Sequence, residues 1–202
     1  MKKKLGKDHP DLSYVYKQIT LLYNDLNKYE DALKYCKKEL RIRKKQLGQD
    51  HPDTAENNAI MANLLNKLEH PSKALFYCKK ALNVMEKLRR KHPNIEVAYH
   101  FMSDILYNLG EYDQALDYLR KELEIIEKKL GKGHYTTARC YNAMGNILSH
   151  QGKDEEASAT IHHGRGPFQR QPGLGRRRMV HRTGKAVLEQ IQKRDPVGNR
   201  VP

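Results

Sequence analysis

A short segment returns along the chain at a nearly constant interval. Leu5–Asp11 reads LGKDHPD and Leu47–Asp53 reads LGQDHPD, a period of 42 residues, and weaker copies follow at Leu88–Asn94 and Leu130–His134. A second landmark, an alanine, keeps the same phase with intervals of 42, 41 and 42 residues. These alanines are Ala32, Ala74, Ala115 and Ala157. Two landmarks with one interval predict an array of four units, each of which buries its core against its neighbours.

Each unit is expected to form two helices. In the first unit, apolar residues recur at helical spacing over residues 15–26 and again over residues 32–42. Short turns are predicted at Asn27–Lys28, Leu109–Gly110 and Gln151–Gly152. Prolines are expected where helices begin, at Pro10, Pro52 and Pro93 for the first helices and at Pro71 for a second helix. No strand-like alternation competes before residue 160. The predicted fold class is therefore all-α, a solenoid with units at about 5–46, 47–87, 88–129 and 130–160, the last incomplete.

These units resemble tetratricopeptide repeats. The features that carry the resemblance are the helix–turn–helix unit, the Tyr-x-x-Ala start of the second helix and a small residue in the first helix. The period of 42 with its LGxDHPD linkers is similar to the subtype found in kinesin light chains and nephrocystin-3-like proteins. Two departures stand out: the general pattern's tryptophan is absent, and only Tyr141–Gly145 comes near the Leu-Asn-Asn-Leu-Ala of kinesin light chains. The resemblance covers residues 5–160 and implies a right-handed superhelix.

The resemblance also implies where a partner would bind, on the concave groove lined by the first helices. The expected contact residues are Tyr14, Lys17, Asn24, Asn63, Asn66, His100, Asp104, Tyr107, Arg139, Asn142 and Asn146. An asparagine side chain both donates and accepts, so it can pair with the backbone of an extended peptide. Lys17, His100 and Arg139 could anchor a carboxylate or phosphate. The alternative interpretation is that these positions are polar because they face water.

No catalytic, cofactor or metal site is predicted. Cys36 and Cys78 occupy one register on the second helices, which favours packing over nucleophilic chemistry, and Cys140 has no matched His and orienting group. The linker histidines His9, His51 and His92 recur at the repeat period, so they are expected to serve each turn structurally. Repeat spacing keeps them too far apart to share one metal ion. We therefore predict a protein that is not an enzyme.

The net charge of +14 is concentrated at one end of the chain. Residues 161–202 carry a net charge of +8, and residues 1–160 carry +6. The segment is rich in Gly, Arg, Gln and Pro, with two glycines and a proline at 164–167, so we predict a disordered basic tail. A short helix at Lys185–Lys193 is the expected exception.

Three interpretations of this tail stay open. Its arginines could bind nucleic-acid phosphates, and the candidates are Arg176, Arg177, Arg178 and Arg182. The same cluster could be a nuclear import signal. The abrupt change of composition inside a second helix also fits a shifted reading frame or a misplaced exon boundary in a fragment, which is the interpretation we favour. Nucleic-acid binding is expected only through the tail.

The favoured function is a protein-interaction module that binds an extended peptide or a helix of a protein partner. The alternatives are a nucleic-acid-associated protein and a cargo-binding fragment of a kinesin-light-chain-like adaptor. No stretch approaches the roughly 18 consecutive apolar residues of a membrane span, and three cysteines without a C-x-x-C pair suit a reducing compartment. We expect a cytoplasmic protein, and uncapped repeat ends would allow end-to-end self-association.

Overall fold

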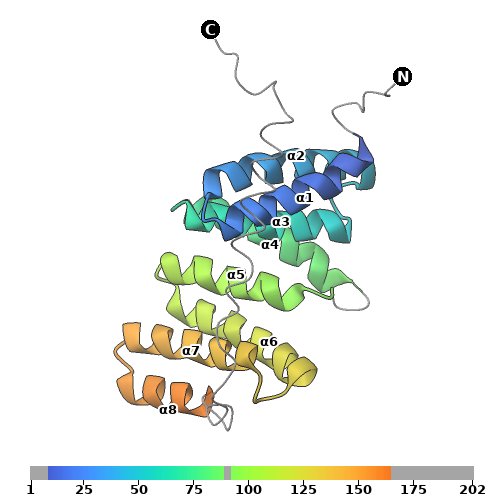
Figure 1. The fold of residues 1–202 in the computed structure, drawn as a ribbon. Helices are drawn as coiled ribbons and strands as arrows, with labels where there is room; N and C mark the ends of the chain where they lie inside the picture. Colours follow the sequence, from blue (N-terminus) through green and yellow to red (C-terminus); the bar gives the residue numbers. More distant parts are fainter. Residues whose placement is uncertain (1–8, 89–91, 165–202) are drawn as a thin grey trace, which may run out of the picture. The chain divides into compact units, whose positions relative to one another are not determined.

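The computed structural model describes residues 9–88 and 92–164, and these form eight α-helices with no strand. Figure 1 shows them as pairs stacked in chain order, with each helix packed on the next and α3 also packed on α5. The first helices of the units are α1 (Pro10–Asp25), α3 (Pro52–Lys67), α5 (Ile95–Asn108) and α7 (Tyr135–His150). The second helices are α2 (Tyr29–Leu47), α4 (Pro71–Lys87), α6 (Tyr112–Leu130) and α8 (Asp154–Gly164). The predicted all-α solenoid is confirmed.

Small residues set the distance between the two helices of a unit. The landmark alanines are 0–4% exposed, and the small residue of each first helix is buried as well. These latter residues are Thr20, Ala62, Ser103 and Gly145. At Gly145 the approach is closest, because an added Cβ would lie 2.4 Å from Cγ1 of Ile161 on α8. The repeat therefore conserves small volume at the two positions where its helices touch.

Histidine side chains cap the first helices. The Nδ1 atoms of His9, His51 and His134 accept the backbone N–H two residues ahead, at 3.3, 3.2 and 3.1 Å. Each bond satisfies one of the four amide groups that a helix start leaves without an intrahelical partner. The expected structural role of the linker histidines is thus confirmed.

The third unit begins differently from the prediction. His92 accepts from the amide of Asn94 at 3.2 Å, but α5 starts only at Ile95, so Pro93 lies before the helix and not in its first turn. In the second and fourth units a threonine hydroxyl braces this turn, as Thr54 Oγ1 donates to the Gly48 carbonyl at 2.9 Å. Ile95 stands in that register and has no hydroxyl, and the linker before it is one residue shorter. These two changes remove the brace that holds the proline turn in the helix.

The turns inside the units share a left-handed residue. Asn27, Glu69, Gly110 and Gly152 have φ of 57°, 60°, 79° and 73°. Glycine suits this conformation and asparagine tolerates it, whereas glutamate at Glu69 is strained by about 1 kcal/mol. The predicted turn positions are therefore correct. The last helix, α8, reaches Gly164, four residues beyond the expected end of the array at 160.

Replacing His51 by alanine is expected to lower the free energy of unfolding by about 1 kcal/mol, because the amide of Asp53 loses its acceptor. His51→Asn should recover most of this loss, since asparagine is a strong N-cap. The control is His70→Ala, because His70 precedes α4 without a side-chain capping bond. Urea unfolding would measure all three variants. Equal losses for His51→Ala and His70→Ala would contradict the capping role.

Candidate functional site

The predicted contact residues all lie on α1, α3, α5 and α7, and none of them is buried. We call this surface the first-helix face and define it by the residues predicted above. Tyr14 is 68% exposed, and Arg139, Asn142 and Asn146 are also exposed. Their exposure permits contact with a partner, whereas their side chains differ greatly in how far they are already engaged.

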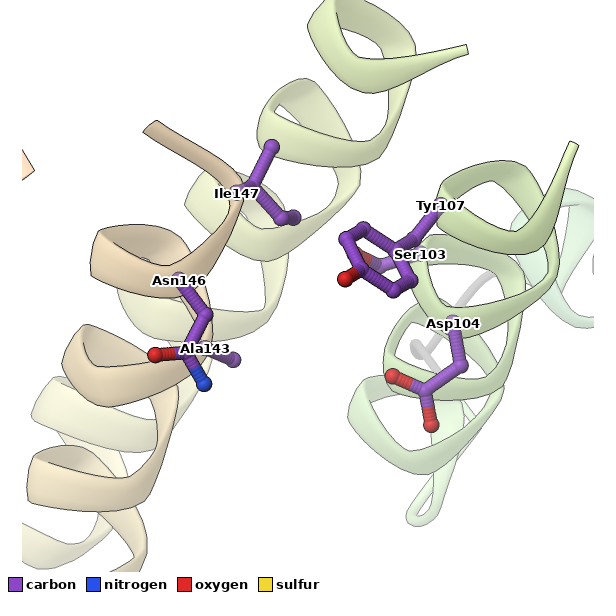
Figure 2. Close-up of a pocket in the computed structure, with 6 residues that line it drawn as sticks. All are labelled: Ser103, Asp104, Tyr107, Ala143, Asn146 and Ile147. Atoms are coloured by element: carbon purple, nitrogen blue, oxygen red, sulfur yellow. The ribbon is translucent and has the colours of Figure 1, made fainter. Parts of the chain in front are cut away.

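One pocket opens on this face between α5 and α7. It has a volume of about 160 Å³ and is lined by Ser103, Asp104, Tyr107, Ala143, Asn146 and Ile147. Figure 2 shows the Asp104 carboxylate and the Tyr107 ring on one wall and the Asn146 amide on the other. The structure thus brings together Asp104, Tyr107 and Asn146 from the predicted set.

A small side chain explains why the pocket lies there. Ala143 occupies a register in which the earlier first helices carry Gln18, Ile60 and Phe101. Those larger side chains would occupy the corresponding space between α1 and α3 and between α3 and α5. The sequence analysis did not single out Ala143, although this aligned column shows the exception.

Three hydrogen bonds join successive units along the ends of the first helices. Lys67 Nζ donates to Asn24 Oδ1 at 3.3 Å, and Asn108 Nδ2 donates to Asn66 Oδ1 at 3.0 Å. In the same register the Tyr107 hydroxyl lies 2.7 Å from His150 Nε2. These bonds fix neighbouring units to each other, so Asn24, Asn66 and Tyr107 are partly used by the scaffold.

The other predicted asparagines are not engaged in this way. Among the described residues, Asn63, Asn142 and Asn146 make no side-chain hydrogen bond. Asn142 and Asn146 are exposed and Asn63 is half-buried. Their amides are therefore available to a backbone laid along the face.

Lys17 is already neutralised. Its Nζ atom lies 2.8 Å from Glu56 Oε2, and both side chains are about a quarter exposed, at 25% and 22%. Burial alone would raise the pKa of Glu56, but the hydrogen bond and charge of Lys17, together with a bond from Asn94 Nδ2 at 3.0 Å, lower it. Lys17 thus has a partner within the array.

His100 lies between two carboxylates. Its Nδ1 atom is 3.0 Å from Glu122 Oε2 on α6, and its Nε2 atom is 3.7 Å from Asp104 Oδ2. Burial would lower the pKa of this imidazole, and Arg139 lowers it too, but the bond to Glu122 and the charges of Glu122 and Asp104 raise it. The cationic form of His100 is therefore favoured.

Arg139 differs from these two cations, because no ion pair or hydrogen bond engages it among the described residues. Tyr14 lies on α1, away from the pocket on α5 and α7. The arginines proposed for nucleic acid, Arg176–Arg178 and Arg182, and the expected helix at Lys185–Lys193 lie outside the described residues.

Two buried glutamates beneath the face escaped the sequence analysis. Glu39 on α2 and Glu122 on α6 are each 1% exposed. Each stands 22 positions after a groove cation, since Lys17 precedes Glu39 and His100 precedes Glu122. The second unit carries Ala59 and Ala81 at the same two positions, and this joint exchange was the signal available in the sequence.

Glu39 is the more strained of the two. Its Oε1 atom lies 2.7 Å from Arg43 Nε, while its Oε2 atom is buried without a hydrogen-bond partner in the described structure. Burial raises the pKa of Glu39 to about 7, although Arg43 and Lys17 oppose the rise. A buried carboxylate of this kind destabilises the fold once it ionises.

Catalytic chemistry finds no support in the described part of the chain. Cys36, Cys78 and Cys140 are fully buried, and burial raises the pKa of each thiol, for Cys78 to about 12. The expected packing role of these cysteines is confirmed. Within residues 9–88 and 92–164, no cluster of three or more potential metal ligands occurs. None of the helices there combines the length and apolar character needed to cross a membrane.

Comparison with known proteins identifies the repeat. A family model described as tetratricopeptide repeat matches residues 15–87 and 94–160. A sequence search found no significantly similar protein among the curated ones. Solved structures with this fold include the kinesin light chain nearly identical TPR-like repeats of Podosopora anserina, at 18% identity and a TM-score of 0.64 over 81% of this chain and 78% of that one.

Two further structures are similar at low identity. BtubC (BKLC) from P. vanneervenii is 14% identical, with a TM-score of 0.65 over 94% of this chain and 68% of that one. Bacillus thuringiensis PlcR, solved in complex with the peptide PapR7 and DNA, is 15% identical with a TM-score of 0.52 over 94% and 70%. At these identities the likeness concerns the fold alone.

Glu39 is expected to make stability depend on pH in a defined direction. Its pKa is about 7 in the folded chain and near 4.5 when exposed, so the folded state holds a proton that the unfolded state has released. The free energy of unfolding should therefore fall by up to about 3 kcal/mol as pH rises from 4.5 to 7.

Glu39→Gln should remove this part of the pH dependence, because an amide does not ionise. Urea unfolding at several pH values between 4.5 and 8 would measure the difference from the natural chain. Glu155→Gln, which removes an exposed carboxylate at the start of α8, serves as the control. An unchanged slope in Glu39→Gln would show that this carboxylate does not govern stability.

Proposed function

The chain belongs to the tetratricopeptide repeat family, and from this premise we propose that its helical array is a protein-interaction module. It binds an extended or helical segment of a protein partner along the first-helix face and performs no chemistry on it. The observation that carries this proposal is the set of unengaged amides, Asn63, Asn142 and Asn146, on the same face as the pocket. Repeat arrays of this class are in general scaffolds for interaction.

The amides suit a backbone ligand in particular. Each offers two N–H donors and a carbonyl acceptor, so each can pair with one peptide unit as a neighbouring strand does. Successive units place them on α3 and α7, so an extended segment would cross the face from unit to unit. The bound peptide in the PlcR structure is consistent with this use of the fold, although that likeness is one of fold only.

Finer features of the proposal rest on the sequence. We infer that the array occupies about residues 5–160, that it belongs to the kinesin light chain and nephrocystin-3-like subtype, and that it works in the cytoplasm. The 42-residue period and the LGxDHPD linkers support the subtype. Self-association through repeat ends, and nucleic-acid binding through the basic segment 161–202, remain secondary candidates.

A peptide selection tests the proposed function. A phage-displayed peptide library would be selected on the immobilised full chain, and the affinities of enriched peptides measured by fluorescence anisotropy. In the triple variant Asn63→Ala, Asn142→Ala, Asn146→Ala we expect at least a tenfold loss, since each lost hydrogen bond contributes about 0.5–1.5 kcal/mol. Asn66 is left intact because it accepts a bond from Asn108 and its loss would disturb the scaffold.

The matched control removes an amide elsewhere. Asn83 is exposed on the second helix α4, so Asn83→Ala should bind the peptides as the natural chain does. Circular dichroism would establish that all variants are folded. Peptides that bind the triple variant unchanged, or an exhaustive selection that enriches none, would overturn the proposal.

A further inference from the structure

The pocket between α5 and α7 has room for one side chain. Its volume of about 160 Å³ is well below the roughly 300–1,000 Å³ of sites for drug-sized ligands. It opens on the first-helix face, next to the unengaged amide of Asn146. Its occupant is therefore expected to be a single group that projects from a larger ligand.

The lining combines an apolar wall with a polar one. Ala143, Ile147 and the Tyr107 ring offer surface to an aliphatic stem, and the Asp104 carboxylate and Asn146 amide offer acceptors. Long cationic side chains have this same division, since they pack their methylene groups on apolar surface and keep the charge at a polar end. The Tyr107 ring also favours a cation over its face.

The charges in direct contact leave the pocket short of a cation. Asp104 and Glu122 share one imidazole, His100, at 3.7 and 3.0 Å, and the Asp104 side chain is still 49% exposed. Arg139 on α7 and Lys67 on α3 act on Asp104 from farther away, and neither is within ion-pair distance of it. Burial and the nearby Glu122 raise the pKa of Asp104, so the carboxylate would gain from a closer positive partner.

We propose that this pocket binds the side chain of a lysine or arginine of the partner, with its cationic group on the Asp104 carboxylate. The stem lies along Ala143 and Ile147, and the Asn146 carbonyl oxygen is the second acceptor. The identity of the occupant as part of a protein partner rests on the proposed function, whereas the pocket's preference for an alkyl cation stands without it.

His100 competes with such a ligand for Asp104. The charged groups that face its ring are Glu122 from α6, Asp104 from α5 and Arg139 from α7. When the imidazolium loses its proton at higher pH, Asp104 loses its nearest cation and becomes free for the ligand. Affinity for an alkyl cation should therefore be higher at pH 8.5 than at pH 6.

The test uses n-butylammonium as the probe, with n-butanol and butyrate as neutral and anionic probes of similar size. Each is titrated into the isotopically labelled full chain, and amide chemical shifts are followed by NMR. We expect n-butylammonium to shift the residues of the pocket saturably, with a dissociation constant on the order of 10 mM. Binding by butanol or butyrate should be at least fivefold weaker.

Two variants take residues that other units already carry in the same register. Asp104→Asn introduces the residue of Asn63 and Asn146, and Ala143→Ile introduces that of Ile60. Both should weaken n-butylammonium binding at least fivefold, the first by removing the charge and the second by filling the space. Asp117→Asn removes an exposed carboxylate on α6 and should leave binding unchanged.

Several results would overturn the proposal. Equal binding of butanol and n-butylammonium would make the pocket merely apolar, and preferred binding of butyrate would mean that Arg139 dominates it. An unchanged affinity in Asp104→Asn, or the absence of saturable shifts, would also refute it. None of these results depends on the peptide selection, so failure of this inference and failure of the proposed function are separable.

Discussion

Close contact between the two helices of a unit is the constraint on which the rest of the structure depends. Ala32, Ala74 and Ala115 are completely buried at the start of the second helices, where a larger side chain would push the pair apart. The first helices answer with a small residue of their own, and at Gly145 even a Cβ would not fit without movement of Ile161. Because every unit repeats this spacing, the first helices come to lie in register, and residues 42 or 43 positions apart meet side by side.

That register couples the core to the functional face. In the first and third units, a buried glutamate of the second helix lies beneath a cation of the first, as Glu122 does under His100 at 3.0 Å. A buried charge is tolerated only when it is paired, so the two residues must change together. The second unit, with Ala59 and Ala81, omits both. The units therefore share one scaffold but present different charges to a partner, and this difference originates in the core.

Periodicity determined which features could be predicted from the sequence. The helices, the turns at Asn27 and Gly110 and the packing of the cysteines recur in several units, so each is supported by more than one copy. Pro93 was placed wrongly in a helix because a linker one residue shorter and the loss of a threonine brace change the start of α5. Such local departures from a repeat carry no second copy against which to judge them.

The functional face was predicted less completely, for a physical reason. Helical spacing shows which residues share a face, but it does not show which neighbour already engages them. Asn66 and Asn63 look equivalent in the sequence, yet Asn66 accepts a bond from Asn108 of the next unit. Likewise, Glu39 stands in the highly charged segment KKELRIRKK, where a carboxylate would be taken for a solvated one, yet it is buried. Only the packing of one unit on the next separates the side chains that hold the array together from those left for a partner.

The pocket shows how little change such a scaffold needs in order to acquire specificity. Replacing the larger side chain of one register by alanine, as at Ala143, opens a space between α5 and α7 without altering the contacts of the second helices. Placing an aspartate where two other units have asparagine gives that space a charge. Neither substitution touches the buried alanines that set the helix spacing, so the stability of the array and the chemistry of its face can vary independently. A solenoid can thus change its partner one register at a time.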